Sequence, residues 1–161
     1  MQMCSIASGS SGNSIYVGTE QVHLLVDCGI SGKRVEQGLD TCGVNAADLD
    51  AILITHEHID HISGLGVLVR RYGKPVYATA GTIEAIRQTS SLGNLAKAEF
   101  VEIKPDESFS IGDVEICPTH IYHDAADPVA YRFDEGEKSI GILTDSGTYD
   151  KTIVDNMHGL D

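Results

Sequence analysis

Four potential metal ligands fall within six positions of the segment His56-Glu57-His58-Ile59-Asp60-His61. The segment follows an apolar run, Ala51 to Thr55, whose aliphatic and β-branched residues predict a buried strand. The ligands would then lie on the loop that leaves the carboxyl end of this strand, where open α/β sheets carry their sites. Imidazole and carboxylate groups suit zinc, iron or manganese, so the first prediction is a metal site.

The spacing of these ligands indicates a pair of metal ions rather than one. His56 and His58 are two positions apart and face the same way on an extended segment, whereas His58 and His61 can share one face of a tight turn. The helical His-Glu-x-x-His motif of metalloproteases does not fit, because position 60 is Asp. A polar turn with coincidental histidines is the plainer alternative.

The pattern His-x-His-x-Asp-His after an apolar strand resembles the metallo-β-lactamase superfamily. Two further segments are similar to the same family: Val22 to Gly29, which ends in Asp-Cys-Gly, and Thr144 to Gly147, which contains Asp145. Three stretches, Ser8 to Ser14, Leu53 to Tyr72 and His123 to Tyr131, resemble its bacterial YycJ/WalJ-type branch, whose members are regarded as metal-dependent nucleases.

The resemblance implies a role for six side chains. His56, His58 and His123 would hold one metal ion, Asp60 and His61 would hold the second, and Asp145 would bridge both. Asp60 would also orient the attacking water. A water shared by two such ions loses a proton near neutral pH, which suits in-line attack on a phosphodiester. Zinc is the first expectation for both ions, with manganese or iron as alternatives.

Three other histidines compete less well for these roles. His120 and His123 both follow one predicted strand, and His123 is preferred because Pro128 and Tyr131 follow it at about the family's distance. His23 alternates with apolar neighbours, which is typical of packing or surface positions. The family's distal histidine ligand has no matching position, and His158 lies on a predicted solvated helix that arrives too early for that role.

Two residues outside the histidine motif are candidates for supporting roles. Asp27 ends a predicted strand, where its carboxylate can accept a hydrogen bond from a ligating imidazole and fix its tautomer; a turn-forming Asp before Gly29 is the alternative. The loop from Ser8 to Ser14 can bring backbone N–H groups to a phosphate, or be a plain turn. Asn13 is its residue expected to contact substrate or the backbone of the site.

The resemblance implies an α+β fold, the four-layer αββα sandwich of mixed β-sheets flanked by helices. Residues 1–161 would form one such domain, incomplete at the C-terminus and containing about its first two-thirds. Apolar faces left uncovered would favour a homo-oligomer. Helices are predicted at 32–42, where Ser31 is the N-cap, 65–72, where Gly73 ends the helix, 82–89 and 148–160. Strands are predicted at 4–7, 15–17, 22–26, 49–55, 76–78, 100–103, 109–111, 113–119, 129–133 and 139–143.

Composition and charge bear on the cellular location, on the redox state of the cysteines and on binding to nucleic acid. No run of apolar residues is long enough to cross a membrane, and the start of the chain lacks a basic region and apolar core, so a cytoplasmic protein is expected. The four cysteines are scattered without a Cys-x-x-Cys pair, which favours reduced thiols over disulfides. The net charge of −13 argues against tight, nonspecific binding to duplex nucleic acid.

Together these features predict a metal-dependent hydrolase, a phosphodiesterase or nuclease whose partner is DNA. Two alternatives stay open. One is a thioester or lactam hydrolase of the same fold, and the other is an inactive metal-binding or self-associating module.

Overall fold

A computed structural model describes residues 1–161, and the part of the chain up to Ile103 is built on a six-stranded sheet in the order β1-β2-β3-β4-β5-β6. The strands are β1 (Gln2–Ala7), β2 (Ser14–Gly18), β3 (His23–Val26), β4 (Ala51–Leu53), β5 (Val76–Thr79) and β6 (Phe100–Ile103). The first three pair antiparallel, and β3 through β6 pair in parallel. The carboxyl ends of β3, β4 and β5 therefore meet at one edge of the sheet, which is where α/β sheets carry their sites.

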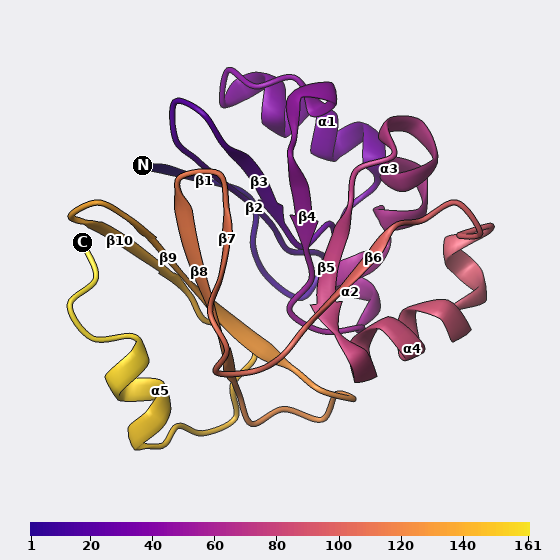
Figure 1. Ribbon diagram of the computed structural model, residues 1–161. Coiled ribbons are helices and arrows are strands. Elements are labelled where there is room, and N and C mark those ends of the chain that lie inside the picture. Colours follow the sequence, from indigo (N-terminus) through magenta and orange to yellow (C-terminus); the bar gives the residue numbers. More distant parts are fainter.

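Helices cover one face of this first sheet (Figure 1). The main ones are α1 (Gly32–Thr41), α3 (Leu65–Tyr72) and α4 (Ala80–Gln88), and the shorter ones are α2 (Ile59–Ile62), η1 (Ala46–Asp48) and η2 (Ser90–Leu92). The predicted caps are confirmed. Ser31 accepts a hydrogen bond from the backbone N–H of Arg34, and Gly73 ends α3 in the left-handed conformation at φ 61°.

The second half forms a four-stranded antiparallel sheet in the order β10-β9-β8-β7. Its strands are β7 (Phe109–Ile111), β8 (Val114–His120), β9 (Val129–Glu135) and β10 (Lys138–Ile142). Tight turns join β7 to β8 and β9 to β10, with Gly112 and Gly136 at positive φ. Helix α5 (Lys151–Asn156) lies on the outer face of this sheet, and both chain ends lie on the same side of the molecule (Figure 1).

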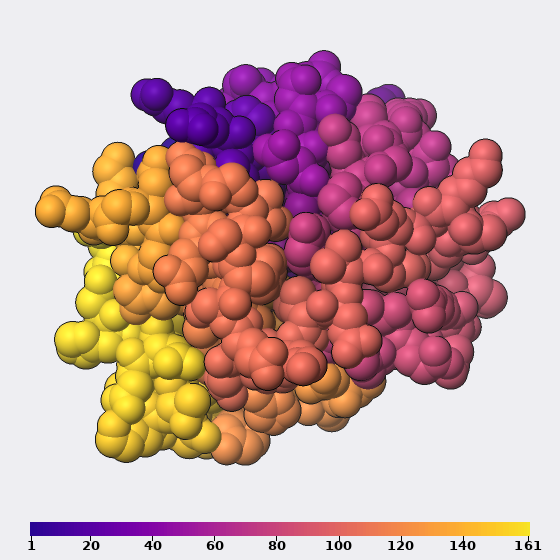
Figure 2. Space-filling view, in the orientation of Figure 1, coloured from indigo at the N-terminus to yellow at the C-terminus, as the bar shows by residue number.

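The apolar core is divided between the layers. One cluster of 20 buried residues packs α1, α3 and α4 against the first sheet, and a second of 13 fills the space between the two sheets. A small third cluster, Ile121, Ala130 and Ile153, anchors α5. In the space-filling view the second sheet, in orange, packs directly beside the magenta helical half, with α5 in yellow at one corner (Figure 2). The predicted αββα order of layers is therefore confirmed.

Some elements differ from the predictions in extent. The strand expected over 49–55 is ordered as β4 only over Ala51–Leu53, and the helix expected over 148–160 forms only over Lys151–Asn156. Helix α2 was not predicted, because a single turn of four residues is too short to produce a periodic pattern. None of the helices is long and apolar enough to cross a bilayer.

The prediction that all four cysteines are reduced is wrong for one pair. Cys4 on β1 and Cys42 at the end of α1 form a disulfide, whereas Cys28 and Cys117 are free thiols. The two paired residues are 38 positions apart, and only the packing of α1 across β1 brings them together. Sequence spacing carries no signal for a pair of this kind.

Large apolar side chains are exposed at seven positions: Met3, Ile59, Val67, Tyr122, Leu143, Tyr149 and Val154. The outer face of the second sheet beyond α5 is polar instead, because it carries Glu115 and Asp134. Self-association through exposed apolar faces stays a prediction.

Candidate metal centre

The histidine segment leaves β4 at the carboxyl edge of the first sheet and is held there by three backbone hydrogen bonds. The N–H of Asn13 donates to the carbonyl of Asp60 at 2.8 Å, that of Cys28 to the carbonyl of His61 at 2.8 Å, and that of Gly64 to the carbonyl of Cys28 at 2.8 Å. The contact is close at Gly29, where a Cβ atom would lie 1.5 Å from the carbonyl oxygen of Asp60. Glycine at position 29 therefore lets the segment seat against the loops that follow β1 and β3.

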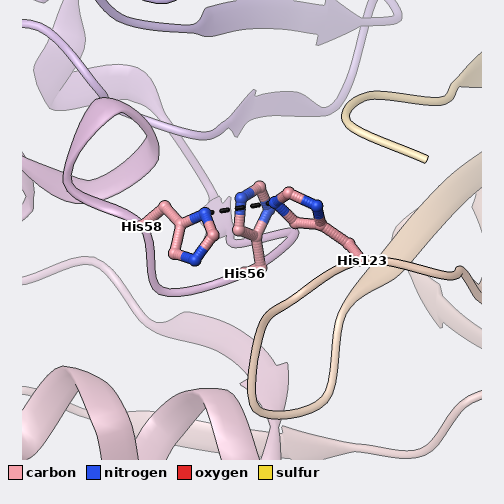
Figure 3. Close-up of side chains that lie close together, drawn as sticks. All are labelled: His56, His58 and His123. Carbon is pink, nitrogen blue, oxygen red and sulfur yellow. Dashed lines mark hydrogen bonds between the residues drawn. The ribbon is translucent and has the colours of Figure 1, made fainter. Parts of the chain in front are cut away.

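Three imidazoles converge from two distant parts of the chain. His56 and His58 come from the segment after β4, and His123 reaches them from the loop after β8 (Figure 3). Their potential ligand atoms lie within 4.8 Å of one another, and His123 Nε2 is 3.1 Å from His58 Nδ1. The predicted first group of ligands is therefore brought together.

A second group adjoins the first and shares His56 with it. Nε2 of His61 lies 2.7 Å from Oδ2 of Asp145, and the same carboxylate oxygen lies 3.6 Å from Nε2 of His56. Asp60 is at the margin, with its Oδ2 3.8 Å from Nε2 of His61. Asp145 thus stands beside both histidine groups, as a bridging carboxylate would.

All four imidazoles have one ring nitrogen turned outward to an oxygen. The outward pairs are His61 Nδ1 to Asp27 Oδ2 at 2.7 Å, His56 Nδ1 to Thr55 Oγ1 at 3.0 Å, His58 Nε2 to the carbonyl of Asp124 at 3.2 Å, and His123 Nδ1 to Asp124 Oδ1 at 3.2 Å. The other nitrogen of each ring belongs to one of the two ligand groups, and that of His56 belongs to both. This is the arrangement by which proteins orient metal-ligating histidines and fix their tautomers.

His56 gives the sharpest test of whether a metal ion fits. Its Nε2 is buried and has no hydrogen-bond partner. Burial, followed by the nearby rings of His61, His58 and His123, lowers the pKa of His56 to about 3. The ring is therefore neutral at pH 7, with a lone pair directed into the cage. Buried polar atoms are otherwise hydrogen-bonded, so this unpaired nitrogen is what a metal ligand requires.

Asp27 and Thr55 form a buried support beneath the histidines. Thr55 donates from its backbone N–H to Asp27 Oδ1 at 2.9 Å and from its hydroxyl to Oδ2 at 2.8 Å. Burial raises the pKa of Asp27, and the hydrogen bond from His61 opposes that shift. Burial of His61 lowers its pKa, but the bond to Asp27 and the Asp27 charge outweigh this, so the net shift is upward. The expectation that Asp27 accepts from an imidazole agrees with this geometry.

Backbone strain gathers at the two carboxylates of this centre. Asp27 has φ 59° and Asp145 has φ 57°, and only one other non-glycine residue, Asp106, has a positive φ. Left-handed conformations of this kind cluster at functional sites, where the surrounding structure enforces them. The supporting role of Asp27 stays a prediction, as does the alternative of a turn-forming Asp.

The remaining histidines lie outside the cage. His120 is exposed and stacks edge-on against Tyr122 with ring centroids 5.8 Å apart, so His123 rather than His120 joins the cluster, as expected. His23 pairs with the hydroxyl of Tyr16 at 2.7 Å, and His158 is exposed after α5. No role for them was expected.

Two further residues, Thr55 and Glu57, take part in the site, although the sequence did not indicate a role for them. Thr55 links Asp27 to His56, as described above. Glu57 accepts a hydrogen bond from the backbone N–H of Ala126 at 2.8 Å, and so joins the histidine segment to the loop that carries His123. Its second oxygen, Oε2, is buried without a partner. Their positions inside the motif were visible, but their partners are 28 and 69 residues away in the chain.

A cavity of about 520 Å³ opens over the cage. Besides ligand candidates it is lined by the loop between β1 and β2 and by the segment after β10. The lining residues are Ser8, Gly9, Ser10, Asn13, His58, Asp60, His123, Leu143, Thr144 and Asp145. Asn13 is nearly buried; its side-chain N–H donates to His61 Nε2 at 3.1 Å and to the carbonyl of Gly9 at 3.2 Å. It therefore touches the site itself, and its contact with substrate stays a prediction.

A four-layer αββα sandwich with imidazoles and carboxylates gathered at the sheet edge is the architecture of metallo-β-lactamase-type proteins. Residues 23–161 match the family model described as the beta-lactamase superfamily domain, so the chain belongs to that superfamily. This fold implies divalent metal ions, and the histidine cluster fits them.

Curated relatives resemble nearly all of the chain. It is 42% identical over 155 residues to "Exodeoxyribonuclease WalJ" of Streptococcus pneumoniae and 39% identical over 155 residues to "Exodeoxyribonuclease YycJ" of Bacillus anthracis. Each match covers 96% of this chain and 56% of the relative, so the chain spans little more than half the length of these proteins.

Solved structures agree with the fold. The metallo-beta-lactamase fold protein YhfI from Bacillus subtilis superposes with a TM-score of 0.75 at 24% sequence identity, over 95% of this chain and 65% of that one.

Proposed function

We propose that this protein is a metal-dependent hydrolase that cleaves phosphodiester bonds in DNA. The observation that carries the proposal is the set of four imidazoles in two adjoining ligand groups that share His56, each ring with one nitrogen turned outward to an oxygen. The names of the two relatives that match 96% of the chain support DNA as the substrate.

Six residues would hold the metal ions. His56, His58 and His123 would hold the first, Asp60 and His61 the second, and Asp145 both. Zinc suits this ligand set, and manganese or iron would also be accepted. Divalent ions bound there would supply Lewis acidity and promote ionisation of a water molecule near neutral pH.

The protein groups around the cage would keep the ligands in the required state. The hydroxyl of Thr55 donates to Asp27, so its oxygen accepts from Nδ1–H of His56 and leaves Nε2 of that ring unprotonated. Asp27 likewise accepts from Nδ1–H of His61, which leaves Nε2 of that ring unprotonated. A metal ion bound there would replace the side-chain N–H of Asn13 as the partner of this nitrogen. Asp60 lies at the margin of the cage and lines the cavity, where its carboxylate would accept a hydrogen bond from the attacking water and orient it.

Hydrolysis of bis-p-nitrophenyl phosphate by the zinc- or manganese-loaded chain tests this proposal. The wild-type chain should bind two equivalents of metal and release p-nitrophenol, and His58→Ala should abolish turnover. His120→Ala is the matched control, because its ring is exposed outside the cage, and it should behave as wild type. One equivalent of metal with no turnover would favour an inactive metal-binding module.

The same preparations tested on oligodeoxynucleotides and on a thioester would identify the bond that is cleaved. Faster cleavage of the thioester than of DNA would contradict the proposed substrate class.

A further inference from the structure

The loop between β1 and β2 forms one wall of the cavity above the cage. Ser8, Gly9 and Ser10 line this cavity together with His58 and Asp60. This wall consists of neutral residues from outside the histidine segment. A substrate bound at the cage would therefore lie beside it.

The polar groups of this wall are available to a ligand. The hydroxyls of Ser8 and Ser10 make no hydrogen bond within the chain, and the backbone N–H groups of Ser10 and Ser11 donate to no protein acceptor. All three serines are exposed. Several unused donors therefore lie next to one another, where an anion can accept from them.

Internal hydrogen bonds fix the loop. Oδ1 of Asn13 accepts from the N–H of Gly9 at 3.0 Å, and Nδ2 of Asn13 donates to the carbonyl of Gly9 at 3.2 Å. The N–H of Gly12 also donates to Gly9 at 3.0 Å, and the carbonyl of Asn13 accepts from Gly29 at 2.7 Å. A loop held in this way loses little conformational entropy when a ligand binds.

Acidic residues line the cavity, so these hydrogen-bond donors are important for binding an anion. No lysine or arginine lines it, whereas Asp60 and Asp145 do. A phosphodiester carries a negative charge that these carboxylates repel. The oxygens of the phosphate group that are not bound by metal ions would need hydrogen-bond donors, and the serine wall provides donors that the rest of the chain does not use.

We propose that Ser8 and Ser10 form a phosphate-binding subsite, in which their hydroxyls and the N–H of Ser10 donate to a non-bridging oxygen of a phosphate group on the substrate. This inference rests on the proposed function, since it assigns a phosphodiester to the same cavity. It gives Asn13 the role of bracing the subsite.

Steady-state kinetics with bis-p-nitrophenyl phosphate on the zinc-loaded chain give the first test. The double variant Ser8→Ala/Ser10→Ala should raise KM about tenfold or more, because each lost bond is a hydrogen bond to a charged group. Metal stoichiometry should be unchanged. Ser11→Ala is the matched control, because its side chain does not line the cavity, and it should keep the wild-type KM. An unchanged KM in the double variant would overturn the subsite and leave the hydrolase proposal standing.

Binding measured without turnover gives the second test. Thymidine 5′-monophosphate titrated into the zinc-loaded chain should shift the backbone amide resonances of Ser10 and Ser11, and the double variant should weaken its binding about tenfold. If the nucleotide binds in this way but no substrate is hydrolysed, the subsite holds and the proposed function fails. If the serine amides do not respond to saturating nucleotide, the subsite is refuted.

Discussion

At the scale of single residues, Glu57 links the two segments that supply His56, His58 and His123. Its Oε1 accepts from Ala126 N–H at 2.8 Å, and Ala126 follows His123 by three positions. The next residue of this loop is held as well, because the hydroxyl of Thr79 donates to the carbonyl of Asp127 at 2.7 Å. Glu57 is therefore a positioning residue, because it acts on metal binding through the loop that carries His123.

Removing this link should weaken metal binding. Glu57→Ala should lower zinc affinity about tenfold, in the range found when partners of metal ligands are removed, whereas Glu57→Gln retains a carbonyl oxygen for Ala126 and should keep most of the affinity. Competition with a chromophoric chelator measures this. The exposed helical residue Glu84, changed to Ala, serves as control. Equal losses in the Gln and Ala variants would contradict a positioning role that works through this hydrogen bond.

His56 should make the metal-free protein sensitive to acid. Its pKa is lowered to about 3 in the folded chain, against about 6.5 in the unfolded chain, so between these values the unfolded state binds more protons. Stability should therefore fall as pH decreases from about 6.5 towards 3. His61 and Asp27, whose pKa values are raised, act in the opposite direction. The contribution of His56 to the pH dependence of stability must therefore be measured by comparing a His56 variant with the wild type.

Urea denaturation in EDTA at pH 7 and pH 5 tests this point. Relative to wild type, His56→Gln should lose less stability between the two pH values, by on the order of 1 kcal/mol after allowance for solvent screening. His120→Gln, at an exposed position, should follow wild type. A wild-type slope in His56→Gln would mean that the buried ring titrates normally.

Most of the candidate ligands could be predicted from the sequence because they lie in one short motif. The spacing of His56, His58 and His61 and the apolar strand before them is a local signal. His123 and Asp145 were assigned through family resemblance, since their approach to the motif depends on how the second sheet packs on the first. The support from Thr55 and Glu57 could not be predicted, because it consists of hydrogen bonds to residues 28 and 69 positions away.

At the scale of elements, the site depends on how closely three loops approach at the carboxyl edge of the first sheet. Gly29→Ala should destabilise the protein by at least about 2 kcal/mol, because its Cβ would overlap the backbone of Asp60. Gly147→Ala is the control, since the nearest atom to its Cβ would be at 3.4 Å, and its stability should change by less than about 1 kcal/mol. Thermal unfolding of both variants measures this. Similar melting temperatures for the two would show that the loops are not tightly packed at Gly29.

The order of the elements was largely predictable, and their limits were not. The residue pattern indicated the strands of the second sheet, and Gly73 was expected to end a helix, as it does. Helix α2 was missed because Asp60 and His61 were expected on a loop, whereas His58 is the N-cap of a helical turn that contains them. The turn is too short for its own sequence to define it; the contacts of its backbone with Asn13 and Cys28 do so.

At the scale of the whole molecule, the disulfide between Cys4 and Cys42 ties the edge strand β1 to α1. Closing a loop of 38 residues should stabilise the fold by about 2–4 kcal/mol. A reducing agent, or the variant Cys4→Ser/Cys42→Ser, should therefore lower the melting temperature. Cys117→Ser removes a free thiol and should not. A melting temperature that is insensitive to reduction would show that this pair does not contribute to stability.

The charge of the whole molecule bears on how DNA would be held. The net charge is −13, and the residues that line the cavity include no lysine or arginine. Binding should therefore depend on the metal ions and on local donors rather than on a general attraction for the phosphate backbone. Binding of this kind is consistent with a site that makes direct contacts with one phosphate group.

Anomalous diffraction at the zinc edge, measured on crystals of the zinc-loaded chain, would show whether these imidazoles and carboxylates form a cage for two metal ions. We expect two neighbouring peaks, one among His56, His58 and His123 and the other beside His61 and Asp60, with Asp145 between them. Zinc bound only elsewhere on the molecule, with no peak among these side chains, would contradict it.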